Sequence, residues 1–450
     1  MKIISFREKA MLLCMLVLIF FFISIFVRLG AKHILIKRLH WDNAITHTIF
    51  FDNKRLQRTE VDAKYRKVDV NWKKAYPFDD AEDVTIWQRG RAFEAKIHTL
   101  EDTKIVDWCT KWLVLYRWFV EAGREVEQKI GWNVINPAMQ VAKMQDGYLT
   151  FVENNKNQDE RIAAVNEFAD FVKSQNAEFL YIQSPGKTNP WGDSEMKGID
   201  YSNENADRLL EGLKAKGISV YDLRQDLYEH VGSAGWHQAF FRTDHHWKPD
   251  TALWAAGRIV EKLANDYGVD VNREHFSLND YYDDKYEKSF LGSQGKKLTL
   301  VNTELDDFDI YYPKFKTNVY MEISECGIRE TGDFSIFYNK QEFGSGDVYN
   351  ETPYAMYGYG DQPEIIVHNF ANENLQDKKI LLIRDSMLDT AMTFLSMGLK
   401  DLRLLDIRHF NGSVRKYVSE YKPDIVLVMY KTSYGEDVKW VGHNDKFDFR

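Results

Sequence analysis

The chain has 450 residues, of which 44% are hydrophobic and 28% are charged, so it can bury a sizeable core and fold as a globular protein. The formal net charge is −9 and the lysines and arginines are scattered along the chain, which excludes a basic surface for nucleic acid. With 26 glycines, 9 prolines and no fixed-period repeat, low-complexity and solenoid architectures are excluded as well.

The first element in the chain is an apolar run over residues 10–27, AMLLCMLVLIFFFISIFV, bounded by Lys9 and Arg28. As a helix, this run is long enough to cross the roughly 30 Å of hydrocarbon in a bilayer. It predicts a transmembrane helix and a membrane anchor over residues 1–28. A cleaved secretory signal is the alternative, although the apolar part of such a signal usually has about 7–15 residues. Positive charges flank the run on both sides and leave its orientation open.

The second predicted region, residues 29–144, is polar and rich in aromatic residues, and we expect it to be a helical juxtamembrane region. Helical periodicity predicts a helix over 103–128. The apolar stripe of this helix consists of Ile105, Trp108, Trp112, Leu115 and Trp118. Such a stripe favours packing against the following domain or the membrane over a ligand site. Cys109, in the same helix, could pair with Cys326 outside the cytoplasm, or both thiols could stay reduced.

From about residue 145, helical and strand patterns alternate. Helices are predicted over 161–175, 206–217 and 250–264, and strands over 178–185, 218–223, 379–384, 402–407 and 424–430. The strands are apolar at most positions, which is typical of a parallel sheet covered by helices on both faces. Residues 145–450 therefore predict an α/β domain of three layers with a mostly parallel sheet.

The segment FFRTDHHWKPDTALWAA, residues 240–256, places an aspartate and two histidines in consecutive positions just before a predicted helix. In an extended segment, positions i and i+2 face the same way, so Asp244 and His246 share a side while His245 points elsewhere. A carboxylate beside an imidazole suits an orienting group and a base. Two alternatives stay open. A metal site would need a third protein ligand, which no residue at ligand spacing supplies, and a structural role would have Thr243 or Asp244 cap the helix.

Between about residues 268 and 375 the pattern becomes irregular and aromatic-rich, which predicts short antiparallel strands and loops inserted into the sheet domain. Insertions at strand ends commonly build the surface that binds substrate. Tyr357 and the tyrosines around it could stack on sugar rings, although aromatic residues more often pack inside a protein.

A buried strand over 379–384 runs directly into Asp385 and Ser386, and an apolar helix ending at Gly398 follows. Open α/β sheets bind ligands at the carboxyl ends of their strands, and the first N–H groups of such a helix can hold a developing oxyanion. Ser386 is therefore a candidate nucleophile, provided that a base such as His246 removes its proton. The alternative is that Asp385 and Ser386 only cap the helix.

Together, TDHHWKPDTALWAA and KKILLIRDSMLDTAMTFL, followed by LRLLDIRHF and KPDIVLVMY, resemble the DHHW family, which is similar to the alginate O-acetyltransferases and to the wider SGNH hydrolase superfamily. The first two motifs are specific in combination, and the last two are ordinary buried strands. The order Asp-x-His before Ser matches the acetyltransferases. The resemblance implies an SGNH-hydrolase-like fold with Ser386 as nucleophile, His246 as general base and acid, and Asp244 as the carboxylate that orients it.

The sequence departs from the superfamily pattern around the nucleophile. Arg384 stands where superfamily members often have Gly, and the Gly and Asn that usually complete an oxyanion hole are not identifiable. We take Ser386, Gly292 and Gly358 as the candidate oxyanion-hole residues. Gly358 lies in the loop YGYGDQ, residues 357–362. Asp361 of this loop stands where an Asn would fit the pattern better.

Two further residues are candidates for contact with substrate. Lys187 lies in SPGKTNP, which resembles a Pro-x-Lys element of the family, although a solvent-facing loop lysine is the simpler interpretation. Tyr357 is the second candidate. We expect no metal and no cofactor at the site.

The resemblance implies a function. We expect a single-pass protein of the cell membrane whose extracytoplasmic domain transfers acetyl groups to a cell-surface or exported polysaccharide through a serine acyl-enzyme. A membrane-bound O-acyltransferase would supply the acyl group. The alternatives are a carbohydrate acetyl-esterase and a non-catalytic glycan-binding or assembly module.

Overall fold

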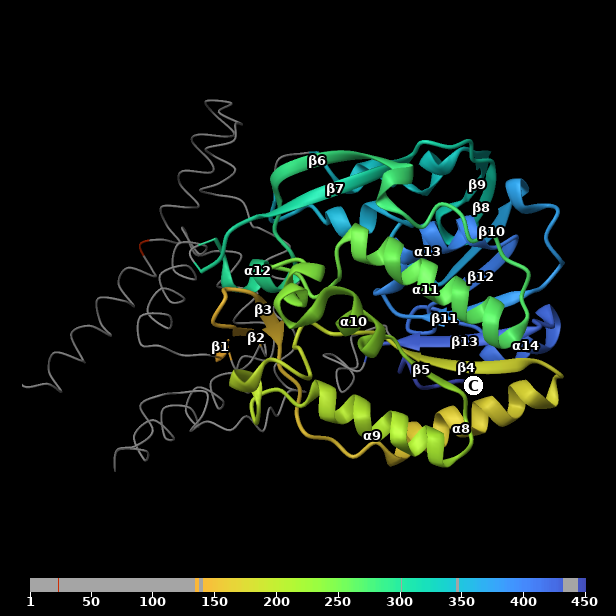
Figure 1. The fold of residues 1–450 in the computed structure, drawn as a ribbon, viewed down its shortest axis with the longest axis horizontal. Coiled ribbons are helices and arrows are strands. Elements are labelled where there is room, and N and C mark those ends of the chain that lie inside the picture. Colours follow the sequence, from red (N-terminus) through yellow and green to blue (C-terminus); the bar gives the residue numbers. More distant parts are fainter. Residues whose placement is uncertain (1–22, 24–133, 137–140, 301, 345–347, 432–443) are drawn as a thin grey trace, which may run out of the picture.

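The computed structural model describes residues 23, 134–136, 141–300, 302–344, 348–431 and 444–450 (Figure 1). The predicted membrane anchor, apart from residue 23, and the predicted helix over 103–128 lie outside the described residues, as does Cys109. Within the ranges that are described, no helix combines the length and the apolar character needed to cross a bilayer.

The main sheet has eight strands, in the order β5-β4-β13-β11-β12-β10-β8-β9. The first five run parallel to one another and the last three are added antiparallel. Their bounds are β5 Val220–Asp222, β4 Glu178–Gln183, β13 Ile425–Tyr430, β11 Ile380–Arg384, β12 Asp401–Leu405, β10 Glu364–Asn369, β8 Val319–Ile323 and β9 Ile328–Gly332. The predicted α/β class is confirmed. Of the short antiparallel strands in the predicted insertion, β8, β9 and β10 extend the main sheet.

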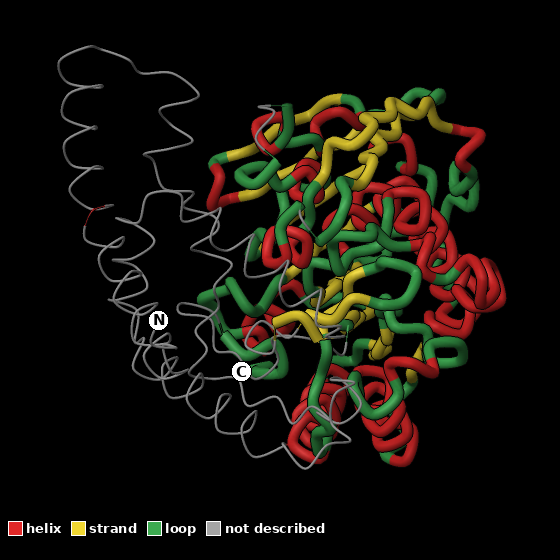
Figure 2. The backbone as a smooth tube through the Cα atoms, turned by 90° about the vertical axis from the view of Figure 1, so that its left-hand side faces the viewer, coloured by secondary structure: helices red, strands yellow, loops and turns green. Residues whose placement is uncertain are grey.

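Helices cover both faces of this sheet, because alternate side chains of its strands are apolar on either side. On one face, Leu382 and Leu427 pack with apolar residues of α11 (Pro249–Tyr267) and α13 (Leu388–Gly398). On the other face, Leu381 and Val426 pack in a core with α8, α9 and α14, which span Asp159–Ser174, Ser202–Ala215 and Val414–Tyr421. Figures 1 and 2 show the strands running between these helical layers. The three-layer prediction is therefore correct.

Helix boundaries follow local sequence signals. The α11 helix begins at Pro249, whose fixed φ suits the first helical position, and ends at Gly268 in the left-handed region with φ of 61°. Asp159 and Glu160 place negative charge in the first turn of α8, where it is favourable. Helix α10 (Leu223–Gly235) opens with the Asp222 side chain accepting from the Arg224 N–H.

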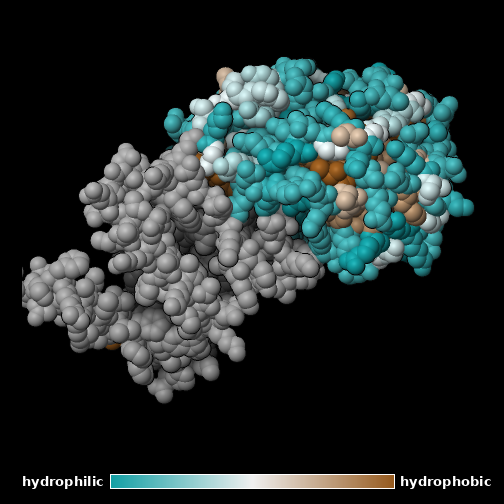
Figure 3. Space-filling model, turned by 90° about the horizontal axis from the view of Figure 1, so that it is seen from below, coloured by the Kyte–Doolittle hydropathy of each residue, from teal (hydrophilic) through white to brown (hydrophobic). Residues whose placement is uncertain are grey.

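Smaller elements lie at one end of the main sheet. A three-stranded sheet consists of β1 (Val134–Asn136), β2 (Val141–Lys143) and β3 (Leu149–Phe151), which lie on both sides of residue 145. The predicted insertion contains the antiparallel ribbon of β6 (Tyr281–Phe290) and β7 (Asp306–Pro313) and the short helix α12 (Ser293–Leu298). The face of the described residues in Figure 3 is mostly hydrophilic, with small apolar patches between polar side chains.

Candidate active site

Ser386 lies in the short turn between the carboxyl end of β11 and the start of α13 at Leu388. Asp385 forms this turn: its Oδ1 accepts from the Met387 N–H at 3.1 Å, and its Oδ2 accepts from the Lys431 N–H at 2.9 Å, just beyond β13. The side chain of Ser386 makes no capping bond and instead faces a histidine. Neither side chain caps α13: Asp385 shapes the turn before the helix, and the hydroxyl of Ser386 stays available for another role.

Asp244, His246 and Ser386 form a continuous hydrogen-bonded relay. His246 Nε2 lies 2.9 Å from Ser386 Oγ, although the two residues are 140 positions apart, and His246 Nδ1 lies 2.5 Å from Asp244 Oδ1. Because a carboxylate only accepts, Nδ1 carries the proton and Nε2 can accept from the serine hydroxyl. Asp244 and His246 are buried, whereas Ser386 is partly exposed. This is the arrangement that a serine needs in order to become nucleophilic.

The carboxylate of Asp244 is held in its charged form. Burial raises its pKa, but electrostatic interaction with the His245 and His246 imidazoles and its hydrogen bonds hold the pKa well below the usual value. The bonds come from the His246 N–H to Oδ1 at 3.1 Å and from the Ser293 N–H to Oδ2 at 2.6 Å. A permanently negative Asp244 stabilises an imidazolium at His246.

The loop that carries these residues is a bend and not the extended segment predicted from sequence. Its ends are joined by bonds from the Phe241 N–H to the His246 carbonyl at 3.2 Å and from the Lys248 N–H to the Ala239 carbonyl at 3.0 Å. Asp244 and His246 face each other because the Asp244 side chain folds back onto the His246 backbone. The expected meeting of the two side chains is correct, while the alternation argument for it is wrong.

Asp306, at the start of β7, clamps this loop from the insertion. Its carboxylate accepts from the Arg242 N–H at 2.7 Å, the Thr243 N–H at 2.8 Å and the Thr243 hydroxyl at 2.6 Å. Thr243 is fully buried and its Oγ1 in turn accepts from the Gly292 N–H at 2.8 Å. Sequence reasoning missed Asp306, since nothing in ELDDFDI separates it from the neighbouring Asp307.

His245 lies beside the relay without belonging to it. Its ring is 3.7 Å from that of His246, and its Nδ1 is 3.0 Å from Ser293 Oγ. Burial lowers the pKa of His245 well below its usual value, with a further contribution from the charge of His246. His245 is therefore neutral near pH 7.

Tyr354 is one of the insertion tyrosines that could stack on sugar rings by sequence, and its place beside His246 was not predicted. It lies in a single 3₁₀ turn, Pro353–Met356, and its ring stacks on the His246 imidazole with centroids 3.8 Å apart and planes at 8°. Its hydroxyl donates to the Met387 carbonyl at 3.0 Å. Only a periodic pattern could have singled it out among the tyrosines of the insertion, and the insertion has none.

Two of the expected oxyanion-hole donors are engaged elsewhere. The Gly292 N–H donates to Thr243 Oγ1, and the Gly358 N–H donates to the Phe337 carbonyl at 2.9 Å. A Cβ at Gly292 would lie 2.2 Å from the Cβ of Asp244, so this glycine permits the close approach of two loops. The N–H of Ser386, by contrast, has no acceptor among the described residues.

Lys187 and Tyr357, the two expected substrate contacts, are both buried. Lys187 lies beneath the 241–246 loop, where its Nζ donates to Gln294 Oε1 at 2.9 Å and to the Arg242 carbonyl at 3.2 Å. Burial lowers the pKa of Lys187 to about 7. Tyr357 is fully buried in the core, where its hydroxyl accepts from the Tyr311 N–H at 2.9 Å.

Arg384 explains the departure from the Gly-Asp-Ser pattern. It is fully buried, pairs with Asp389 in the first turn of α13, and donates to the carbonyls of Gly360 at 3.1 Å and Gln362 at 3.3 Å. The arginine therefore ties a loop of the insertion to the nucleophile's helix. Asp361, in that loop, pairs with Arg408 at 2.6 Å.

Two groups of acidic and histidine residues lie close enough to share a metal ion. The first is Asp244, His245 and His246, but both ring nitrogens of His246 already face protein partners. In the second, Asp361, Asp406 and His409, the guanidinium of Arg408 bonds both carboxylates and so occupies the position of a cation. We assign no metal to either group.

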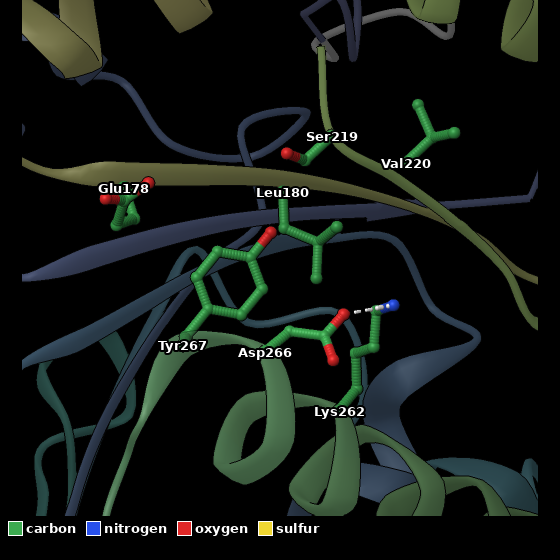
Figure 4. A pocket seen from close by; sticks show the side chains of 7 residues that line it. All are labelled: Glu178, Leu180, Ser219, Val220, Lys262, Asp266 and Tyr267. Atoms are coloured by element: carbon green, nitrogen blue, oxygen red, sulfur yellow. Dashed lines mark ion pairs between the residues drawn. The ribbon is translucent and has the colours of Figure 1, made fainter.

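A cavity of about 640 Å³ lies at the other end of the sheet (Figure 4). It is lined by Glu178, Leu180, Ser219, Val220, Lys262, Asp266 and Tyr267. Glu178 is the first residue of β4, whereas Ser386 follows the end of β11, which runs parallel within the same sheet. The cavity is therefore separate from the Ser386 site, and we assign it no role.

Comparison with known proteins agrees with this geometry. The family described as "ALGX: SGNH hydrolase-like domain, acetyltransferase AlgX" matches residues 144–293, which include Asp244 and His246. Residues 144–293 are thus similar to an SGNH hydrolase-like domain. The resemblance to the DHHW family and to SGNH-type acetyltransferases, inferred from the two motifs, is thereby confirmed.

Solved structures share the fold of this SGNH hydrolase-like domain. Bacillus cereus PatB1 is 22% identical with a TM-score of 0.52, over 69% of this chain and 99% of that one. A DHHW family protein from Eubacterium siraeum is 18% identical with a TM-score of 0.50, over 67% of this chain and 92% of that one. No protein with a curated description matches the chain significantly. At these identities the similarity concerns the fold alone.

Proposed function

We propose that this protein is an O-acetyltransferase that moves acetyl groups onto hydroxyls of a polysaccharide through an acyl-enzyme on Ser386. One observation carries the proposal: Ser386 Oγ lies 2.9 Å from a histidine whose other nitrogen lies 2.5 Å from a buried carboxylate. The match of residues 144–293 to an acetyltransferase family supports acetyl transfer as the reaction class.

The first half-reaction loads the serine. His246 Nε2 takes the proton of Ser386 as Oγ attacks the carbonyl carbon of an acetyl ester, which gives a tetrahedral oxyanion. The Ser386 N–H, which has no acceptor among the described residues, is available to this oxyanion. Collapse of the intermediate breaks the bond to the donor oxygen, which leaves with the proton from His246, and acetyl-Ser386 remains.

The second half-reaction transfers the acetyl group from Ser386 to an acceptor. His246 takes a proton from an acceptor hydroxyl, whose oxygen attacks the acetyl carbon, and Ser386 leaves as it regains the proton. A sugar hydroxyl as acceptor gives acetyl transfer, and water gives hydrolysis. Transferase and esterase thus share one site and differ in how well the site excludes water from the ester.

Labelling with a serine-directed fluorophosphonate tests the nucleophile. We expect wild type to label and Ser386→Ala and His246→Gln to lose labelling, with Ser324→Ala, an exposed serine of the insertion, as the matched control. If wild type neither labels nor cleaves an aryl acetate, the non-catalytic alternative is favoured. The ratio of acetylated oligosaccharide to free acetate, measured as the acceptor concentration rises, separates transferase from esterase.

The location of the protein belongs to the same proposal. The apolar run over residues 10–27 supports a single-pass anchor, with the SGNH hydrolase-like domain outside the cytoplasm and a membrane-bound O-acyltransferase as acyl supplier. Protease treatment of intact cells tests the side of the membrane. A domain that stays protected until the cells are lysed contradicts it.

A further inference from the structure

Tyr354 contacts both of the chain segments that meet at the site. Its ring lies face to face with the His246 imidazole, with centroids 3.8 Å apart and planes at 8°. Its hydroxyl donates at 3.0 Å to the carbonyl of Met387, the residue directly after Ser386. Burial raises the pKa of Tyr354 far above its usual value, so the phenol keeps the proton that it donates.

The loop that presents Tyr354 is fixed by contacts of its own. The backbone at Gly358, with φ of 63°, is so close to α13 that a Cβ there would lie 2.7 Å from the Asp389 carbonyl. Arg384 donates to the Gly360 and Gln362 carbonyls. These contacts fix the loop against the turn that carries Ser386. The position of the loop therefore does not depend on the Tyr354 ring, and the loop can position that ring.

We propose that Tyr354 is a positioning residue of the reaction, an inference that rests on the proposed function. Its ring fixes the plane of the His246 imidazole so that Nε2 points at Ser386 Oγ, while its hydroxyl holds the turn that carries Ser386. Its π face also stabilises the imidazolium that forms when His246 takes the serine proton. The other titratable groups that interact with His246 are Asp244 and His245 from its own loop and, electrostatically, Asp361 from the insertion.

Substitutions at Tyr354 separate the ring from the hydroxyl. Tyr354→Phe keeps the stacked ring and frees the Met387 carbonyl, whereas Tyr354→Leu and Tyr354→Met remove the aromatic face. Methionine fills irregular gaps, so the second aliphatic variant guards against misfolding of the first. Tyr338→Phe is the matched control, since it removes a buried hydroxyl of the insertion that bonds the Tyr311 carbonyl. Thermal melting checks that each variant is folded.

Aryl acetate hydrolysis by the full chain gives the readout. We expect kcat of the Leu and Met variants to fall by about 10- to 100-fold with KM within about twofold, and Tyr354→Phe to recover most of the loss. Without the π face, the imidazolium that forms as His246 takes the serine proton is less stable, so the loss appears in kcat and not in KM.

The outcomes distinguish this inference from the proposed function. If wild type labels at Ser386 but a folded Leu or Met variant keeps kcat within twofold, or loses activity only through KM, the role of Tyr354 is refuted and the proposed function stands. If wild type shows no Ser386-dependent labelling or turnover, both are refuted. A fall in kcat that Tyr354→Phe does not recover refutes the role assigned to the ring face.

Discussion

Replacing Asp306 by alanine tests how the insertion supports the site. The carboxylate accepts three hydrogen bonds, from the Arg242 N–H, the Thr243 N–H and the Thr243 hydroxyl, at 2.6–2.8 Å. Its removal leaves two backbone N–H groups in or near the interior without an acceptor, at about 1–3 kcal/mol each. Burial raises the pKa of Asp306, which means that its charge is costly to bury, and losing that cost offsets part of the penalty. We expect a net destabilisation of about 2–4 kcal/mol.

The same substitution loosens the loop that carries Asp244 and His246. A misplacement of about 1 Å at a reacting group can cost about 10²-fold in rate. We therefore expect kcat for an aryl acetate to fall by about 10²-fold even at temperatures where the variant is folded.

Urea unfolding gives the stability of Asp306→Ala, and steady-state turnover gives its activity. Asp307→Ala is the matched control, because this neighbour is partly exposed and pairs with Lys285 at the surface. A surface pair of this kind contributes about 0–1 kcal/mol. If the free energies of unfolding of the two variants agree within about 1 kcal/mol, and both keep wild-type kcat, the clamp assigned to Asp306 is refuted.

Three further predictions follow from the packing. Gly292→Ala places a Cβ 2.2 Å from that of Asp244, and we expect kcat for an aryl acetate to fall by about 10²-fold. Burial lowers the pKa of Lys187 from 10.5 to about 7, so between these values the unfolded chain binds the proton more tightly and stability rises with pH. Urea unfolding of Lys187→Met should lack this rise, and any advantage of the variant over wild type should be greatest below pH 7 and shrink as the pH rises. Arg384→Met removes the cation paired with Asp389, and because burial holds the pKa of Asp389 well above its usual value, the carboxyl can take up a proton. We therefore expect a loss of at most about 3–5 kcal/mol, part of which Arg384→Met with Asp389→Asn should recover in thermal melting.

The sequence predicted those parts of the fold and the site for which the local residue pattern and the strand topology point to the same structure. Apolar runs located the parallel strands, and the rule that ligands bind at strand carboxyl ends singled out Ser386. The Asp244–His246 pair was recognised because its chemistry lies within three residues. These two signals brought together groups 140 positions apart, which the structure places in contact.

The same reasoning could not identify the residues that support the Asp244–His246–Ser386 relay. Asp306 shares the buried face of β7 with Phe308 and Ile310, but the alternation does not show which segment that face contacts. Tyr354 lies in a 3₁₀ turn, which has no such alternation. Lys187 lies in a loop, where a lysine is ordinarily exposed, and only the fold shows that the 241–246 loop covers it. Antiparallel pairing of β8 and β10 with the main sheet depends on contacts between distant segments, which periodicity does not report.

These residues change the role of the insertion. From sequence it was expected to build a surface for substrate, yet it supplies the clamp on the 241–246 loop through Asp306 and the ring against His246 through Tyr354. The hydrogen bonds of Arg384 tie it to the turn of Ser386 as well. Since the insertion contacts both segments of the relay, it is part of the framework that sets the relay's geometry. Substitutions at buried residues of the insertion should therefore lower kcat more than they lower the affinity for an acceptor.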